Sequence, residues 1–122
     1  MGGLVAYAGA VRAGEGELLW DFERGVEELL GLDLAPVAQV LAALGHPVRL
    51  ALVRALLRGP KASQDLQEEI GLATSGPLYY HLKALTAAGI VSQPNRNRYA
   101  VEPRRIVPFL AVLVAAIDAG GM

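Results

Sequence analysis

The stretch 75–88 constrains the fold most strongly, because its leucines repeat with the period of one helix face. With Leu78 set at 0° and each residue advancing about 100°, Leu82 lies at about 40° and Leu85 at about 340°. These three side chains predict a buried stripe. Pro77 fits the first turn of such a helix, where its missing N–H is not needed.

The other side of this helix is predicted to combine small, aromatic and basic residues. Gly76, Tyr80 and Lys83 lie between about 140° and about 200° from Leu78, and Tyr79 lies at the border, at about 100°. His81, at about 300°, falls on the shoulder of the buried stripe. We expect His81 to be structural and the other four residues to be accessible to a partner.

Charge is unevenly distributed, although the net charge is only −1. Residues 1–35 carry two basic and seven acidic side chains, a net charge of −5, whereas residues 71–122 carry five basic and two acidic ones, a net charge of +3. No carboxylate occurs between Glu69 and Glu102. Such a stretch indicates an anion-facing surface, although a charge difference this small is also compatible with chance.

Two β-hairpins and several further helices are expected around this segment. Residues 4–12 and 17–23 read as strands joined by a turn, and alternation places Trp20 and Phe22 on one face. That face is expected in the core, or alternatively along an apolar effector pocket. The other expected elements are a short helix at 24–31, helices at 35–44, 46–58 and 63–70, a basic hairpin turning at 95–97, and an apolar helix at 103–119.

Local signals also predict how some of these elements begin and which side chains pair. Ser63 and Ser75 are suitable N-caps, and His46 is expected to cap or pack at the break before its helix. Arg49 and Arg54 are placed to pair with the carboxylates of residues 68 and 69. Pro108 leaves open whether it kinks the last helix or marks its true start.

Composition excludes several classes of function. The 122 residues suit one domain, 53% are hydrophobic, and the absence of cysteine removes disulfides, thiolate nucleophiles and thiolate metal sites. The N terminus lacks the basic region of a signal peptide. The longest apolar run, 106–117, is shorter than the about 20 residues of a membrane span. We therefore expect a cytoplasmic protein with no membrane partner, catalytic site or cofactor, since no nucleophile–base pair or metal cluster is visible.

Two helices joined by a turn and followed by a basic hairpin form the plan of a winged helix-turn-helix. The segment LAALGHPVRLALVRALLRG resembles the first core helix of ArsR-type bacterial repressors. LYYHLKALTAAGIV resembles the recognition helix of that family running into its wing. The resemblance covers about residues 36–102. It implies a homodimeric DNA-binding transcriptional regulator, usually a repressor released by an effector, here a possible small molecule.

The chain departs from this family at the positions that usually sense metals. Many members use cysteines, or His and Asp on the terminal helix, whereas this chain has no cysteine and offers only Asp118 on its terminal helix. We therefore expect no metal site of the usual kind. Gly76 and Pro77 also replace the commoner Ser/Thr-rich start of the recognition helix.

The expected fold class is α+β, mainly α: a winged helix-turn-helix with an added N-terminal β-hairpin and a C-terminal dimerisation helix. Residues 1–34 form the extension, 35–102 the DNA-binding domain and 103–122 the dimerisation helix. The expected contacts with double-stranded DNA are Ser63, Gln64, Thr74, Ser75, Gly76, Tyr79, Tyr80, Lys83, Arg96 and Arg98. The expected dimer contacts are Leu110, Val112, Leu113, Ala116 and Ile117. The alternative function is a protein–protein interaction module on a winged-helix scaffold that has lost DNA binding.

Overall fold

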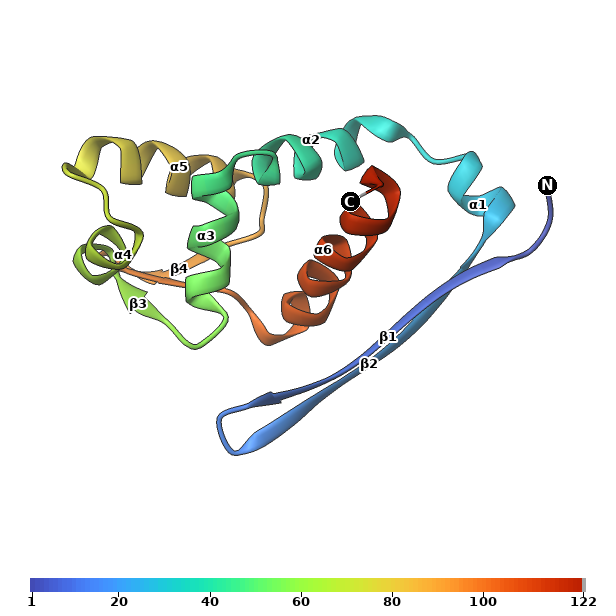
Figure 1. Ribbon diagram of the computed structural model, residues 1–122, viewed down its shortest axis with the longest axis horizontal. Helices are drawn as coiled ribbons and strands as arrows, with labels where there is room; N and C mark the ends of the chain where they lie inside the picture. Colours follow the sequence, from blue (N-terminus) through green and yellow to red (C-terminus); the bar gives the residue numbers. More distant parts are fainter. Residues whose placement is uncertain (122) are drawn as a thin grey trace. The chain divides into compact units, whose positions relative to one another are not determined.

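The structure, a computed structural model, describes residues 1–121 as two compact units (Figure 1). One unit combines Met1–Asp33 with the C-terminal segment that begins at Pro103, and the other is Leu34–Glu102. The first therefore joins the two ends of the chain, while the second is continuous in sequence.

The first unit begins with the long β-hairpin that the alternating sequence predicts. Strands β1 (Leu4–Ala13) and β2 (Gly16–Gly25) pair antiparallel, with Tyr7 opposite Phe22 and Gly9 opposite Trp20. One face of the hairpin is therefore largely apolar, whereas the other carries most of the acidic side chains. A five-residue helix, α1 (Val26–Leu30), follows directly.

The last helix packs on this hairpin. A 3₁₀ turn, Pro103–Arg105, leads into α6 (Ile106–Gly120), so Pro108 lies in the first turn of the helix and does not kink it. Helix α6 contacts β1, and a Cβ built on Gly9 would lie 2.5 Å from Cγ1 of Val107. The absence of a side chain at Gly9 therefore permits close approach of the helix.

The apolar face of the hairpin is less buried than the sequence predicts. Trp20 is half-buried, but Phe22 retains 40% of its exposure, so the expectation that both lie in the core is wrong for Phe22. Phe22 instead lines a hollow of about 190 Å³ with Val5, Tyr7 and Leu29. A two-stranded hairpin supplies only one layer, so apolar side chains that no helix of the same unit covers stay exposed.

The second unit holds the remaining helices and a small sheet. Its helices are α2 (Leu34–Leu44), α3 (Pro47–Leu56), α4 (Ser63–Ile70) and α5 (Ser75–Ala87). Its strands are β3 (Lys61–Ala62), β4 (Ser92–Asn95) and β5 (Arg98–Ala100), in the sheet order β3-β5-β4. The fold class and the winged helix-turn-helix plan predicted from the sequence are confirmed.

The core of this unit consists mainly of leucines from α3, α4 and α5. The predicted stripe of Leu78, Leu82 and Leu85 is at most 1% exposed. Leu52, Val53 and Leu56 of α3 and Leu66 of α4 are at most 2% exposed. Because these leucines face the core, the opposite side of α5 faces solvent.

Two of the three predicted caps differ from the structure. His46 is the N-cap of α3, as predicted, and its Nδ1 accepts a hydrogen bond from the backbone N–H of Val48. Helix α4 instead begins at Ser63 after an extended Ala62, and α5 begins at Ser75 after an extended Thr74; neither cap residue makes a side-chain bond. Each serine is thus the first residue inside its helix, with its hydroxyl free of the capping role.

Within residues 1–121, no single helix is both long enough and apolar enough to cross a membrane. Helices α2 and α3 meet that length and composition only as a pair, and the break between them bends by 87°.

Candidate nucleic-acid interface

Ser63 joins the first helix of the motif to both the wing and the recognition helix. Its backbone N–H donates to the carbonyl of Asn97 in the wing turn at 3.0 Å. Its Oγ accepts a hydrogen bond from the hydroxyl of Tyr79 on α5 at 3.3 Å. Strand β3, immediately before Ser63, pairs with β5 of the wing. The start of α4, Tyr79 of α5 and the turn of the wing are therefore adjacent.

Helix α5 presents the small, aromatic and basic face that the periodicity predicts. Thr74, Ser75, Gly76, Tyr79, Tyr80 and Lys83 are all exposed. The first turn of α5 contains no acidic residue, so its free N–H groups and the positive end of its dipole are available to an anion. A Cβ built on Gly76 would meet nothing within 4 Å. This end of the helix is thus open to close approach.

The two tyrosines of this face differ in their surroundings. Tyr79 is 46% exposed and bonds to Ser63, whereas Tyr80 is 67% exposed. Burial, and secondarily the proximity of Tyr79, raise the pKa of Tyr99 in the wing. Tyr79 is therefore joined to α4 by a hydrogen bond, and Tyr80 is the more exposed of the two side chains.

A histidine–arginine cluster lies beneath Tyr80. His81 is only 7% exposed, and its Nδ1 accepts a hydrogen bond from Nε of Arg49 at 3.0 Å. Its imidazole is therefore neutral and carries its proton on Nε2. Burial, then the neighbouring His46 and Arg49, lower the pKa of His81.

The same cluster extends to the aromatic rings around it. The His46 and His81 rings lie 4.5 Å apart, and the Arg49 guanidinium lies 5.6 Å from the Tyr80 ring centre. The predicted pairing of Arg49 with the carboxylates of α4 is wrong, because the side chain bonds to α5 instead. This contact joins residues 32 positions apart, and no local pattern in a single sequence signals it.

The wing carries two exposed arginines close to its turn. Arg96 lies in the turn between β4 and β5, and its carbonyl accepts a hydrogen bond from Nε2 of Gln93 at 2.6 Å. Nη2 of Arg98 lies 3.5 Å from the carbonyl of Pro60, at the limit of a hydrogen bond. Arg96 and Arg98 flank Asn97 in the sequence. Because the carbonyl of Asn97 accepts a hydrogen bond from the Ser63 N–H, both arginines belong to the part of the wing that adjoins the start of α4.

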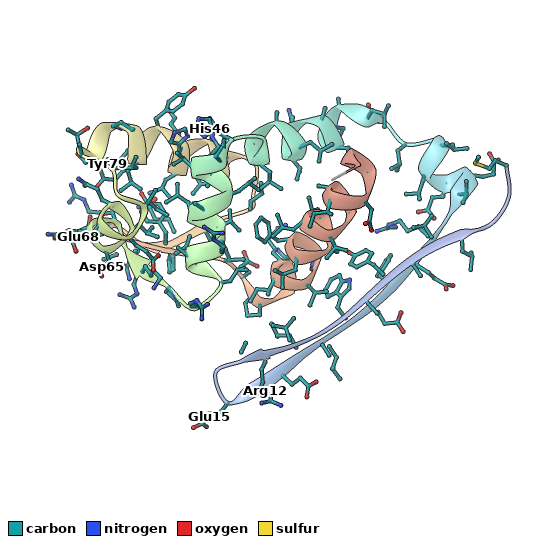
Figure 2. All side chains as sticks on the ribbon, in the orientation of Figure 1. Arg12, Glu15, His46, Asp65, Glu68 and Tyr79 are labelled. Atoms are coloured by element: carbon teal, nitrogen blue, oxygen red, sulfur yellow. The ribbon has the colours of Figure 1, made fainter. Side chains whose placement is uncertain are left out.

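Acidic side chains border this surface on α4. Figure 2 labels Asp65 and Glu68 on this helix and Tyr79 on α5, all at the same end of the winged-helix unit. Gln64, next to Asp65, is exposed as well. Glu69 lies 4.0 Å from Nζ of Lys61, a weak ion pair. The basic groups are therefore concentrated on α5 and the wing rather than along α4.

The structure brings the predicted DNA-contact residues together on α4, α5 and the wing. Within residues 1–121, no three His, Asp or Glu side chains come close enough together to hold a metal ion.

The predicted dimer contacts lie on α6 of the other unit, where Leu110, Val112 and Leu113 are half-buried and Ala116 and Ile117 are exposed. Sequence reasoning missed the hydrogen bonds of Ser63, because they depend on how β3 pairs with the wing.

Comparison with known proteins identifies the same architecture. Residues 44–94 match the family model described as a helix-turn-helix domain. No curated protein sequence matches the chain. Among solved structures, a possible transcriptional regulatory protein (fragment 1–100) from Mycobacterium bovis is 26% identical with a TM-score of 0.62, covering 70% of this chain and 96% of that one.

Two further structures are similar. The transcriptional repressor BigR from Xylella fastidiosa is 26% identical, with a TM-score of 0.59 and coverage of 77% of this chain and 95% of its own. A solution structure from M. bovis is described as the homodimeric winged helix-turn-helix DNA-binding domain of a possible ArsR-family regulator. It is 25% identical, with a TM-score of 0.61 and coverage of 76% and 86%.

One of these neighbours is thus a transcriptional repressor, the M. bovis structures are of possible transcriptional regulators, and one of them is a homodimeric DNA-binding domain. The resemblance predicted from the sequence is confirmed: the chain is similar to ArsR-family winged helix-turn-helix regulators, and it lacks cysteine.

Proposed function

We propose that the protein is a sequence-specific DNA-binding transcriptional regulator, acting as a repressor in the cytoplasm. The observation that carries this proposal is the exposed, carboxylate-free face of α5, which Ser63 connects to the wing turn. A helix of about 10–12 Å diameter fits a major groove about 12 Å wide. Function as a regulator rather than an enzyme agrees with the similarity to known regulators.

Each predicted contact has a role consistent with its position. Ser63, Gln64, Thr74 and Ser75 lie at the starts of α4 and α5, where hydroxyl, amide and backbone N–H groups can bind phosphate. Lys83, Arg96 and Arg98 supply positive charge to neighbouring phosphates. Gly76, Tyr79 and Tyr80 approach sugars and base edges, and they are the part of the surface that reads sequence.

The protein is proposed to bind as a two-fold dimer through α6. Ile117 is 49% exposed and Val114 61% exposed on a helix with few polar side chains. A second copy would cover this apolar surface. Two recognition helices about 34 Å apart would then read the halves of a pseudo-palindromic site. Without cysteine, and with only Asp118 on α6, regulation through the usual metal sites of the family is not proposed.

The test is fluorescence anisotropy with a duplex selected by the protein from random sequences and with a scrambled duplex of equal length. We expect the wild type to prefer the selected duplex, and the double variant Tyr79→Ala with Tyr80→Ala to lose at least about tenfold of that preference. Circular dichroism checks that the variant is folded. If the preference is the same without both tyrosines, they do not read sequence.

The alternative proposal, a protein-interaction module without DNA binding, is favoured by the exposed carboxylates of β2 and α4. Asp21 and Glu23 on the hairpin and Asp65 and Glu68 on α4 are all exposed. The same anisotropy experiment distinguishes the two proposals. Absence of binding to any duplex at physiological salt, together with retention of a partner protein, would favour the interaction module.

A further inference from the structure

A hollow in the winged-helix unit lies beside the C-terminal half of the recognition helix. It has a volume of about 380 Å³ and is lined by Gln39, Ala42, Ala43, Arg49, Ala84, Ala87 and Ala88. Five of these seven residues are alanines, so most of its wall is formed by small apolar side chains, with Gln39 and Arg49 as the polar groups. The volume falls within the about 300–1,000 Å³ of small-molecule sites.

Arg49 gives this hollow a positive charge without a counter-charge. The side chain is half-buried; its Nε donates to neutral His81, and its guanidinium faces the Tyr80 ring. Within residues 1–121, no carboxylate lies within ion-pair distance of Arg49. A partly desolvated guanidinium that bonds only to neutral groups has unused donors that favour an anion.

A second hollow in the same unit shows the contrasting arrangement. It is about 260 Å³ in volume and is lined by Arg54 and Arg58 together with the carboxylate residue Glu69. A carboxylate therefore lines the same hollow as these two arginines, although Glu69 pairs with Lys61 rather than with either of them. The hollow at Arg49, in contrast, has no carboxylate among its lining residues.

We propose that the hollow at Arg49 binds a small carboxylic acid with an apolar body. The carboxylate would accept hydrogen bonds from the Arg49 guanidinium and the Gln39 amide. The apolar body would contact the alanines of α2 and α5. Guanidinium suits this role because its planar donors match a carboxylate in two parallel hydrogen bonds.

The position of Arg49 connects this hollow to the proposed DNA surface, and this further step rests on the proposed function. Ala84 and the C-cap residue Ala88 follow Tyr80 at intervals of four residues, so all three lie along one side of α5. Arg49 contacts both His81 and Tyr80 from α3. A bound carboxylate draws the guanidinium away from Tyr80 and changes the affinity of the protein for DNA.

Binding is tested on the protein without DNA, by titrating amide signals in ¹H–¹⁵N NMR spectra with benzoate, phenylacetate or hexanoate. Each acid is compared with its neutral amide. We expect at least one acid to give saturable shifts at Ala84, Ala87 and Ala88 with a dissociation constant below about 10 mM, and its amide to bind at least about tenfold more weakly. No saturable shift with any acid, or equal binding of the amide, would overturn the site.

Three variants locate the binding. Arg49→Gln should weaken it at least about tenfold, whereas Arg54→Gln, in the second hollow, should leave it unchanged. Since Arg49→Gln also removes a bond to His81, Ala87→Leu provides an independent test. Ala87 is exposed, and a leucine there fills the hollow without entering the core. Wild-type affinity in a folded Ala87→Leu protein would refute the site.

The effect on DNA is measured separately, by repeating the anisotropy titration with the selected duplex in the presence of the acid that binds. A change in affinity of at least about fivefold, absent in Arg49→Gln, is expected for a coupled site. If the acid binds but DNA affinity stays the same, the coupling is wrong. If no duplex binds, the proposed function fails while the NMR result still decides the site.

Discussion

At the scale of single residues, the buried contact between Arg49 and His81 defines the back of the recognition helix. His81 fits there only as a neutral acceptor, because its Nδ1 receives the Arg49 Nε–H at 3.0 Å. Protonation would place two cations against each other in a site with 7% exposure. The sequence predicts a structural role for His81 but not its partner, since helix periodicity gives the face and not the opposing side chain.

This contact makes stability depend on pH. Burial, His46 and Arg49 lower the pKa of His81 from its ordinary value of 6.5, so between the two values the unfolded chain binds more protons. The contribution of neutral His81 to the free energy of unfolding is complete above about pH 6.5. It is lost as the pH falls from there to the lowered pKa of the folded protein, by at most about 1.4 kcal/mol per pH unit. Urea unfolding at several pH values measures it.

His81→Gln is the matched variant, because an amide oxygen accepts the Arg49 hydrogen bond without titrating in this range. We expect its free energy of unfolding to fall less steeply between pH 6.5 and the lowered pKa than that of the wild type. An identical pH profile in the two proteins would mean that His81 does not titrate as its surroundings indicate.

At the scale of elements, helices and hairpins follow local patterns that a sequence displays directly. The leucine period identified α5, and alternation identified β1 and β2, because each pattern spans one element. The sequence predicts that α4 starts near Ser63, but it does not predict what Ser63 binds. Its N–H binds Asn97 and its Oγ binds Tyr79, and both partners are brought there by sheet pairing and helix packing.

The packing of α6 on the hairpin depends on Gly9. A methyl group at this position would lie 2.5 Å from Cγ1 of Val107, a contact that requires the helix or strand to move. We expect Gly9→Ala to destabilise the protein by about 1–3 kcal/mol in urea unfolding. Adding Val107→Ala removes the clashing atoms, so the double variant should lose less stability than the sum of the single variants. Strict additivity would contradict this packing.

At the scale of the whole molecule, the main question is how two copies associate. The apolar, exposed C-terminal half of α6 is the proposed contact. Ile117→Asp would place a charge in that contact and should raise the dimer dissociation constant at least about a hundredfold. Asp118→Lys, at the next position, is a control expected to keep the dimer. Analytical ultracentrifugation measures both, and a dimeric Ile117→Asp protein would exclude this half of α6 from the interface.

The central proposal, that the exposed face of α5 enters a DNA groove, is tested most directly by the salt dependence of binding. Log affinity is plotted against log salt concentration for the wild type, for Lys83→Ala and for Arg58→Ala, a control cation outside α5. If Lys83 contacts phosphate, Lys83→Ala should reduce the slope by about 0.9 per protomer, while Arg58→Ala leaves it unchanged. An unaltered slope in folded Lys83→Ala would contradict the placement of this face against DNA.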